Sequence, residues 1–209
     1  LWNSCCAGNA LCRILPGRVP DADSAFEIPC KKHVNQQKGV GIMDALETLF
    51  TRRSIRKYTD QPVADADVQT MLKAAMLAPS ANNKQPWHFI VVKQPEHLKA
   101  VAEMHPYGKM AAQAPLAIIV CGEVADPEYW IQDCAAATEN LMLAARALGI
   151  GSVWCGLHPR EERKTPFKEY FKIAEGVEPF ALIVLGYPAQ PFNEADKRVQ
   201  PAKIHQEQW

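Results

Sequence analysis

Residues 116–121 read Leu-Ala-Ile-Ile-Val-Cys, a nearly continuous apolar run that is typical of a central strand buried on both faces of a sheet. Three further runs have the length and composition of strands, at residues 87–92, 152–155 and 180–185. Because helical patterns separate these runs along the chain, the sequence predicts a layered domain in which helices cover a sheet of about four strands.

The helical patterns differ in length and in polarity. Residues 44–53 have apolar side chains on one side of a short helix. Residues 65–76 carry an apolar stripe, with Asp65 in the position of an N-cap. Residues 128–148 form the longest pattern, which is rich in alanine and apolar on most sides, and Gly149 ends it. This last helix is therefore expected to be buried.

The composition of the 209 residues limits the function. Lysine and arginine together number 23, as do aspartate and glutamate, so the formal net charge is zero. A general nucleic-acid-binding protein would carry a basic excess, and a zero net charge gives no attraction to an anionic membrane surface. No apolar run approaches the roughly 20 residues that cross a bilayer. We therefore expect a globular protein with no nucleic-acid or membrane partner.

Seven cysteines, an odd number, argue against a disulfide framework. None stands in a C-x-x-C pair, and neither they nor the six histidines have the spacing of metal ligands. Cys121, Cys134 and Cys155 lie in apolar surroundings that are typical of buried reduced thiols. These features favour a reducing, cytoplasmic location and predict no metal site.

Residues 1–42 differ from the rest of the chain. They contain four of the cysteines and three prolines without a sustained helical or strand period, and they lack the pattern of a secretory signal. We place the start of the domain, residues 43–209, at Met43 and interpret residues 1–42 as an extension that is poorly ordered or not native. The alternative is a genuine extension that packs on the domain or binds a partner.

Three segments between the predicted elements have unusual chemistry. The first, residues 52–58, reads Arg-Arg-Ser-Ile-Arg-Lys-Tyr and places four cations and a serine hydroxyl at a helix end. Arginine forks onto phosphate oxygens and serine donates a further bond, so this segment suits a phosphate group. A solvated, charged turn at a helix C-terminus is the other interpretation.

The second segment, residues 79–87, reads Pro-Ser-Ala-Asn-Asn-Lys-Gln-Pro-Trp and lies between a predicted helix and a predicted strand. A rigid loop with these amides would aim donors and acceptors at a planar heteroaromatic ligand, although the same residue types are common in ordinary turns.

The third segment, residues 149–157, reads Gly-Ile-Gly-Ser-Val-Trp-Cys-Gly-Leu. Its G-x-G follows a helix and precedes a strand, the reverse of the order in a dinucleotide-binding fingerprint, so it is not a Rossmann signature. The first glycines suit a helix-to-strand turn, and Gly156 after the strand would let a ligand approach the main chain.

Together and in this order, the three segments resemble the FMN-dependent nitroreductase family, over nearly all of residues 43–209. The tail is similar to that of the short bacterial members, with Lys197-Arg198 followed by Lys203-Ile-His205 and Trp209. The resemblance implies an α+β fold with a central mixed sheet flanked by helices. It also implies an intertwined homodimer that binds two FMN molecules at the subunit interface.

The resemblance implies three groups of flavin-binding residues. One would contact the phosphate, ribityl chain and pyrimidine side of FMN: Arg52, Arg53, Ser54 and Arg56, completed at the phosphate by Lys197 and Arg198. A second would reach the flavin from the loop before the first strand, with Ser80 and Asn83 coming from the partner subunit: Pro79, Ser80, Asn83 and Gln85. A third would line the ring near its reactive nitrogen: Trp154, Cys155 and Gly156, with Lys109 as a further contact.

The implied activity is that of an FMN-dependent oxidoreductase. It would pass a hydride from NADH or NADPH through the flavin to a nitroaromatic, quinone or similar small acceptor, in a ping-pong cycle. No side chain need act as nucleophile or acid, and Cys155, without an evident histidine or acidic partner, is interpreted as a packing or flavin-lining residue. The alternatives are a flavin-binding or storage protein without efficient turnover, and a dehalogenase-type or flavin-fragmenting member of the same fold.

Overall fold

Within the described residues, a four-stranded antiparallel sheet with strand order β1-β2-β4-β3 forms the centre of the domain. The strands are β1 (Trp87–Val92), β2 (Leu116–Glu123), β3 (Gly151–Gly156) and β4 (Val177–Gly186). The sheet differs from the expected mixed one, because its three strand pairs are all antiparallel. Among the described residues, the only parallel pairing is an isolated bridge between Ser54 and Ser152.

The computed structural model describes residues 44–125, 128–192 and 198–209. The expected extension, residues 1–42, and Lys197 lie outside these ranges. Residues 199–209 belong to a separate unit, in which a short turn, η4 (Pro201–Lys203), precedes stacked rings of His205 and Trp209 at a centroid distance of 4.3 Å. None of the helices in the described segments has the length and apolar character that a membrane span requires.

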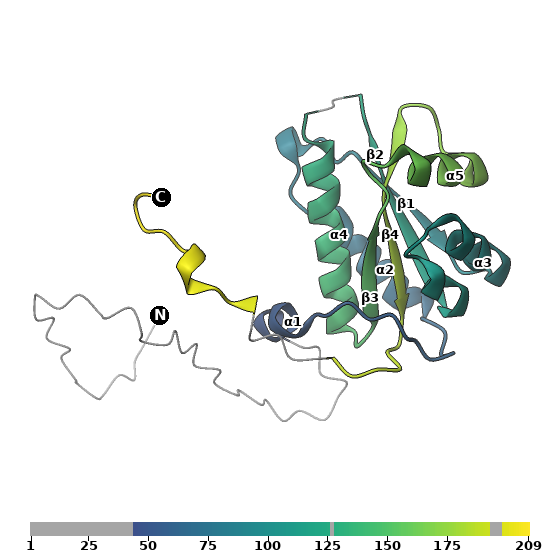
Figure 1. Ribbon diagram of the computed structural model, residues 1–209, viewed down its shortest axis with the longest axis horizontal. Helices are drawn as coiled ribbons and strands as arrows, with labels where there is room; N and C mark the ends of the chain where they lie inside the picture. Colours follow the sequence, from purple (N-terminus) through teal and green to yellow (C-terminus); the bar gives the residue numbers. More distant parts are fainter. Residues whose placement is uncertain (1–43, 126–127, 193–197) are drawn as a thin grey trace, which may run out of the picture. The chain divides into compact units, whose positions relative to one another are not determined.

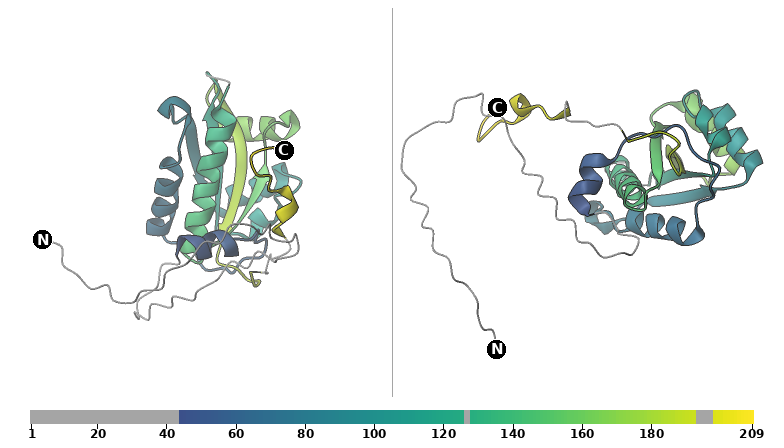
Figure 2. Two further views of the ribbon diagram at one scale, coloured as in Figure 1. Left: turned by 90° about the vertical axis from the view of Figure 1, so that its left-hand side faces the viewer. Right: turned by 90° about the horizontal axis from the view of Figure 1, so that it is seen from below.

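Helices cover both faces of the sheet, so the domain has three layers (Figure 1). Helices α2 (Asp65–Met76) and α4 (Trp130–Ala147) pack on one face, and α3 (Pro95–Met104) and α5 (Glu161–Phe171) pack on the other. Figure 2 shows the same arrangement from two further directions. The short helix α1 (Ala45–Thr51) precedes them, capped by Asp44, whose Oδ1 accepts hydrogen bonds from the amides of Leu46 and Glu47.

Strand β2 shows why the sheet needs helices on both sides. Its side chains alternate between two apolar cores: Leu116, Ile118 and Val120 face the α2–α4 layer, and Ala117, Ile119 and Cys121 face the α3–α5 layer. All six are buried, as the near-continuous apolar run predicts. The thiol groups of Cys121 and Cys134 are reduced and buried, and burial raises the pKa of each to about 12.

The predicted elements are confirmed in order, with shifts at some ends. The first strand, residues 87–92, has the predicted bounds, and Gly149 follows α4 with a positive φ of 75°, which ends the helix. The prediction that Asp65 is an N-cap is wrong, because the extended residue before α2 is Ala64. Asp65 is instead the first helical residue, and a hydrogen bond from Lys93 lowers the pKa of its carboxyl group.

The arginine-rich segment, residues 52–58, lies along the β3 edge of the sheet. The amide of Ile55 donates to the carbonyl of Ser152 at 2.9 Å, and the amide of Ala189 donates to the carbonyl of Lys57 at 2.9 Å. The hydroxyl of Tyr58 lies 2.6 Å from the carbonyl oxygen of Ile55 and 3.0 Å from that of Val184. These bonds fix the segment to parts of the chain that lie far from it in sequence, and the shortest separation is the 97 residues from Ile55 to Ser152.

Two paired glycines make this attachment possible. Gly151 of β3 is opposite Gly186 of β4. A Cβ atom on Gly151 would lie 2.8 Å from the side chain of Ile55, and one on Gly186 would lie 2.7 Å from Pro115 and 3.0 Å from Tyr58. A side chain at position 151 would therefore displace Ile55 of the arginine-rich segment, and one at position 186 would displace Pro115 and press on Tyr58.

Gly151→Ala is expected to destabilise the protein by about 1–3 kcal/mol, because the added methyl group overlaps the fully buried Ile55 side chain. Gly156→Ala is the matched control on the same strand, since the nearest atom to its Cβ would lie 3.9 Å away. Urea unfolding followed by tryptophan fluorescence measures both free energies of unfolding. Equal losses in the two variants would show that contact with Ile55 does not explain the glycine at position 151.

Candidate functional site

A cavity of about 490 Å³ lies at the C-terminal end of β3, and we call it the β3 cavity. Three segments line it: the second half of β3, residue 56 of the arginine-rich segment, and the turn that follows α3. Its lining residues are Arg56, His105, Pro106, Tyr107, Lys109, Met110, Val153, Trp154, Cys155 and Gly156.

Five residues that the sequence singles out line this cavity: Arg56, Lys109, Trp154, Cys155 and Gly156. Arg56 and Lys109 are exposed, so they place two positive charges beside the partly buried surface of β3. Gly156 offers bare main chain, because the nearest atom to a Cβ there would be 3.9 Å away. The cavity therefore combines cations, an indole and accessible backbone.

The cations before Arg56 lie beside the cavity and do not line it. The Nε atom of Arg52 is 3.4 Å from a carboxylate oxygen of Glu139 on α4. The Nη1 atom of Arg53 donates to the carbonyl of Arg52 at 2.5 Å. Ser54 is exposed and forms the parallel bridge to β3. Of the tail cations, Arg198 is exposed and does not line the cavity, and Lys197 lies outside the described residues.

Arg146 on α4 is a further cation near this segment, and sequence reasoning missed it. Its Nε donates to the hydroxyl of Thr51 at 3.0 Å, and its guanidinium lies 3.9 Å from the ring centroid of Phe192. Burial lowers the pKa of Arg146, and the charge of Arg53 acts in the same direction. Arg146 therefore contacts two segments: Thr51 at the end of α1, and Phe192 in the chain after β4. Phe192 lies a few residues before the tail cations in sequence.

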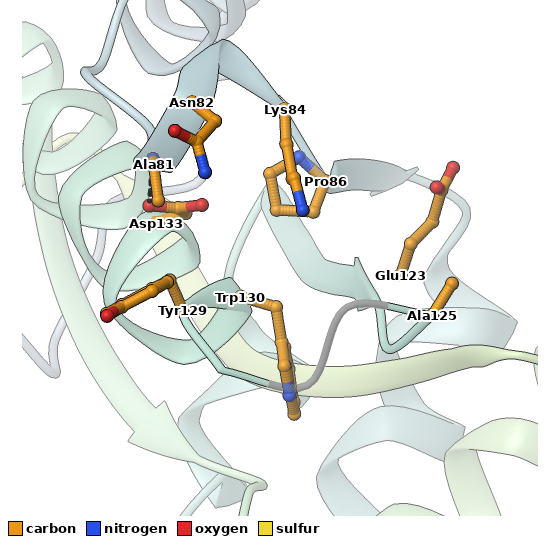
Figure 3. Close-up of a pocket in the computed structure, with 9 residues that line it drawn as sticks. All are labelled: Ala81, Asn82, Lys84, Pro86, Glu123, Ala125, Tyr129, Trp130 and Asp133. Carbon is orange, nitrogen blue, oxygen red and sulfur yellow. Dashed lines mark hydrogen bonds between the residues drawn. The ribbon is translucent and has the colours of Figure 1, made fainter.

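A second cavity, of about 420 Å³, lies between the loop before β1, the end of β2 and the start of α4 (Figure 3). Figure 3 shows the side chains of Asn82 and Lys84 reaching from the loop toward this space. Its lining residues are Ala81, Asn82, Lys84, Pro86, Glu123, Ala125, Tyr129, Trp130 and Asp133. The predicted loop residues Pro79, Ser80, Asn83 and Gln85 line neither cavity.

The loop before β1 is held in an unusual backbone conformation. Asn82, Asn83 and Gln85 have φ angles of 51°, 56° and 50°, in the left-handed region that residues other than glycine rarely adopt. The buried carboxylate of Asp133 accepts a hydrogen bond from the amide of Ala81 at 3.0 Å, and the hydroxyl of Ser80 accepts one from the amide of Gln85 at 3.1 Å. These bonds fix the loop while Asn83 and Gln85 stay exposed.

The Cys155 thiol is poorly suited to act as a nucleophile. Its Sγ donates to the carbonyl of Tyr107 at 3.3 Å, and burial raises its pKa, against a smaller opposing effect of Arg56. The nearby His105 uses both ring nitrogens on main-chain groups, at Tyr107 and at Gly156, so it is not placed as a base for this thiol. These contacts favour the interpretation of Cys155 as a lining residue.

His105, Tyr107 and Met110 line the β3 cavity although sequence reasoning did not single them out. The six histidines are scattered along the sequence, and none has the spacing of metal ligands. Within the described parts of the chain, no group of three or more His, Cys, Asp or Glu side chains is placed to hold a metal ion. The signal for His105 is instead local, a His-Pro-Tyr-Gly turn directly after a helix.

Comparison with known proteins assigns the fold. The sequence model of the nitroreductase family matches residues 49–106 and 100–187. The chain belongs to the nitroreductase family.

Relatives within this family match most of the chain. An Archaeoglobus fulgidus protein, provisionally named NADH dehydrogenase/NAD(P)H nitroreductase, is 50% identical over 172 residues, which are 79% of this chain and 99% of that protein. The Bacillus subtilis FMN reductase [NAD(P)H] is 26% identical over 190 residues, 79% of this chain and 74% of that protein. A solved FMN-dependent nitroreductase from Clostridium difficile superposes with a TM-score of 0.75 at 30% identity, over 78% of this chain and 99% of that one.

Proposed function

We propose that this nitroreductase-family protein is an NAD(P)H-dependent oxidoreductase that binds FMN in the β3 cavity and reduces a small electrophile such as a nitroaromatic or a quinone. The observation that carries the proposal is the convergence of three separate sequence segments on one cavity, through Arg56, Lys109 and the Trp154–Gly156 end of β3. Similarity to the FMN reductase of Bacillus subtilis and to the FMN-dependent nitroreductase of Clostridium difficile supports the choice of cofactor.

The residues at the β3 cavity fit the chemistry of FMN. A volume of about 490 Å³ lies within the usual range for small-molecule sites, and the bare main chain of Gly156 allows close approach of a flat ring. The FMN phosphate carries about two negative charges, which arginines stabilise through charge-assisted bonds. An extended chain rises about 3.3 Å per residue, so the main-chain positions of Arg52 and Arg56 are about 13 Å apart. The two side chains can therefore bind different groups of one elongated ligand.

The protein's own residues would bind the ligand, control charge and exclude water. Arg56 and Lys109 would lower the energy of an anionic ligand in the cavity, while the Trp154 ring and the Met110 side chain would keep water from its surface. When bound, FMN would supply the two-electron chemistry, hydride transfer from NADH or NADPH to the acceptor in a ping-pong cycle, while the residues of the β3 cavity hold the ring in place. The buried Cys155 thiol stays protonated near neutral pH, because burial raises its pKa.

We also propose that two copies of the chain complete each site. Apolar side chains of α1 and of the end of α2 are at least half exposed in the single chain: Leu46, Leu49, Phe50, Met76 and Leu77. A partner that covered them would remove apolar surface from water, which favours association. The exposed side chains of Asn83 and Gln85 do not line their own chain's β3 cavity. Gln85 Nε2 donates to Asn83 Oδ1 at 2.8 Å, and the remaining donors and acceptors of these two amides would face a partner's flavin.

The purified protein is expected to be yellow, with the visible absorption bands of an oxidised flavin. Anaerobic addition of NADH or NADPH should bleach these bands, and a nitroaromatic or a quinone should restore them. Stopped-flow absorbance measures both half-reactions. Bound flavin that neither nucleotide reduces would favour a storage protein, and protein that binds no FMN would contradict the proposal.

Arg52→Ala is expected to weaken FMN binding about 10- to 150-fold, because hydrogen bonds to a charged group contribute about 1.5–3 kcal/mol. Fluorescence quenching measures the dissociation constants of FMN and of riboflavin, which lacks the phosphate and should bind equally well to both proteins. Glu139→Gln is the control, since it removes the partner of Arg52 and keeps the guanidinium. An unchanged FMN dissociation constant in Arg52→Ala would remove this residue from the phosphate site.

Phe50→Glu is expected to shift the protein from dimer to monomer in sedimentation velocity and to lower its flavin content, because it places a charge on the exposed apolar side of α1. Tyr170→Glu is the control, an exposed aromatic residue of α5 on the other face of the sheet. A wild-type protein that sediments as a monomer with its full flavin content would contradict the two-copy site.

A further inference from the structure

His105 is fully buried where the turn after α3 meets the end of β3. Its Nδ1 is 3.1 Å from the amide nitrogen of Tyr107, which can only donate, so Nδ1 accepts. Its Nε2 is 3.1 Å from the carbonyl oxygen of Gly156, which can only accept, so Nε2 carries the proton. These two main-chain contacts fix the neutral imidazole in one tautomer.

The same contacts join two walls of the β3 cavity. Tyr107 belongs to the turn wall and Gly156 to the strand wall. A second bond between the walls runs from the Cys155 thiol to the carbonyl of Tyr107, at 3.3 Å. The two bonds involve the neighbouring β3 residues Cys155 and Gly156. Together they fix the distance between the end of this strand and the turn.

Helix α5 supports this connection from behind. The Nη1 atom of Arg163 donates to the same Gly156 carbonyl at 3.1 Å, and its guanidinium lies 5.4 Å from the ring centroid of Tyr107. The ring of Phe167 meets the imidazole edge-on, at a centroid distance of 6.5 Å. On the turn side, a Cβ atom on Gly108 would lie 2.9 Å from that of His105. The imidazole thus has little room to take another position.

We propose that His105 is a positioning residue for the flavin, whose neutral imidazole sets the separation of the turn from Gly156 and hence the fit of the ring in the β3 cavity. This role rests on the proposed function, since it concerns the same FMN site. His105 acts on the ring-binding part of the cavity, whereas Arg52 would act on the phosphate. The two residues therefore predict different responses to loss of the phosphate group.

Acid should disrupt the arrangement. A proton on Nδ1 would face the amide proton of Tyr107, so the hydrogen bond between them would be lost. Of the groups around His105, the Arg163 cation from α5 opposes this protonation. Arg56 and Lys109 add positive charge to the same cavity, and the Cys155 thiol of β3 is neutral and does not favour the imidazolium. Burial, with a smaller effect of Arg163, lowers the pKa of His105, although the bond to Gly156 opposes the shift.

The sign of the pH effect follows from the lowered pKa. The folded protein holds His105 neutral at and above its ordinary pKa of about 6.5, and the unfolded chain takes up the proton more readily. The stabilisation from the neutral form is therefore complete above about pH 6.5 and is lost as the pH falls from there through the folded pKa. Flavin affinity should also decrease as the pH falls, once His105 of the folded protein is protonated.

The test measures dissociation constants of FMN and riboflavin between pH 4.5 and pH 8. His105→Leu should weaken both flavins by about tenfold, because it removes the acceptor of the Tyr107 amide and one of the two donors to the Gly156 carbonyl, and with them the bonds that join the turn to β3. His105→Gln should retain wild-type affinity at neutral pH, since its amide group can donate to Gly156, and it should remove the loss of riboflavin affinity in acid. His97→Gln is the control, because His97 is exposed and contacts Tyr170 away from the cavity.

Riboflavin is needed in the acid series because it has no phosphate to titrate. Urea unfolding monitors the fold, and Arg163→Gln provides a milder change, expected to weaken both flavins by about threefold because one of the two donors to Gly156 remains. Wild-type protein that binds neither flavin would overturn the proposed function and this role with it. If the wild type binds FMN, then unchanged flavin affinities in His105→Leu and Arg163→Gln, or an acid profile that His105→Gln leaves unaltered, would overturn the role of His105 alone.

Discussion

The close contact of Ile55 with Gly151 is the constraint on which the candidate site depends. Ile55 has no exposed surface, and it reaches this depth only because β3 carries no side chain at position 151. The contact fixes the arginine-rich segment in register with β3, so Arg56 lies at the same cavity as Cys155 and Gly156. The packing of Ile55 against Gly151, at the start of β3, thereby places Arg56 beside the cavity at the end of β3.

The two conspicuous loops of the sequence are fixed by different means. The arginine-rich segment is held by main-chain bonds to the sheet edge, whereas the loop before β1 is held by the buried carboxylate of Asp133 and by the hydroxyl of Ser80. The left-handed residues in the second loop cost energy, so the hydrogen bonds around them must offset that strain. Such a loop presents its amides in a set direction before any ligand or partner arrives, which lowers the entropy lost on binding.

Local patterns in the sequence predict the elements and much of the β3 cavity, and long-range main-chain contacts explain what they miss. The apolar run at 116–121 determines a strand, and the glycine after α4 determines a helix end. Both effects are local, so the sequence alone predicts them. For His105, the local His-Pro-Tyr-Gly turn marks its position but not its role, because its partner is the carbonyl of Gly156, 51 residues away, and every residue has a carbonyl. The same reason explains why the predicted mixed sheet is wrong. Local patterns do not indicate which strands pair or in which direction, and all three strand pairs are antiparallel.

Burial gives the β3 cavity a charge of one sign. It raises the pKa of the Cys155 thiol and lowers that of the His105 imidazole, so both of these lining groups are held in their uncharged forms at neutral pH. The charges that line the cavity then belong to Arg56 and Lys109, both exposed and both positive. A site of this kind favours an anionic ligand, and its buried thiol and imidazole stay neutral beside it. That combination suits a protein whose bound cofactor performs the chemistry while the chain fixes its position and potential.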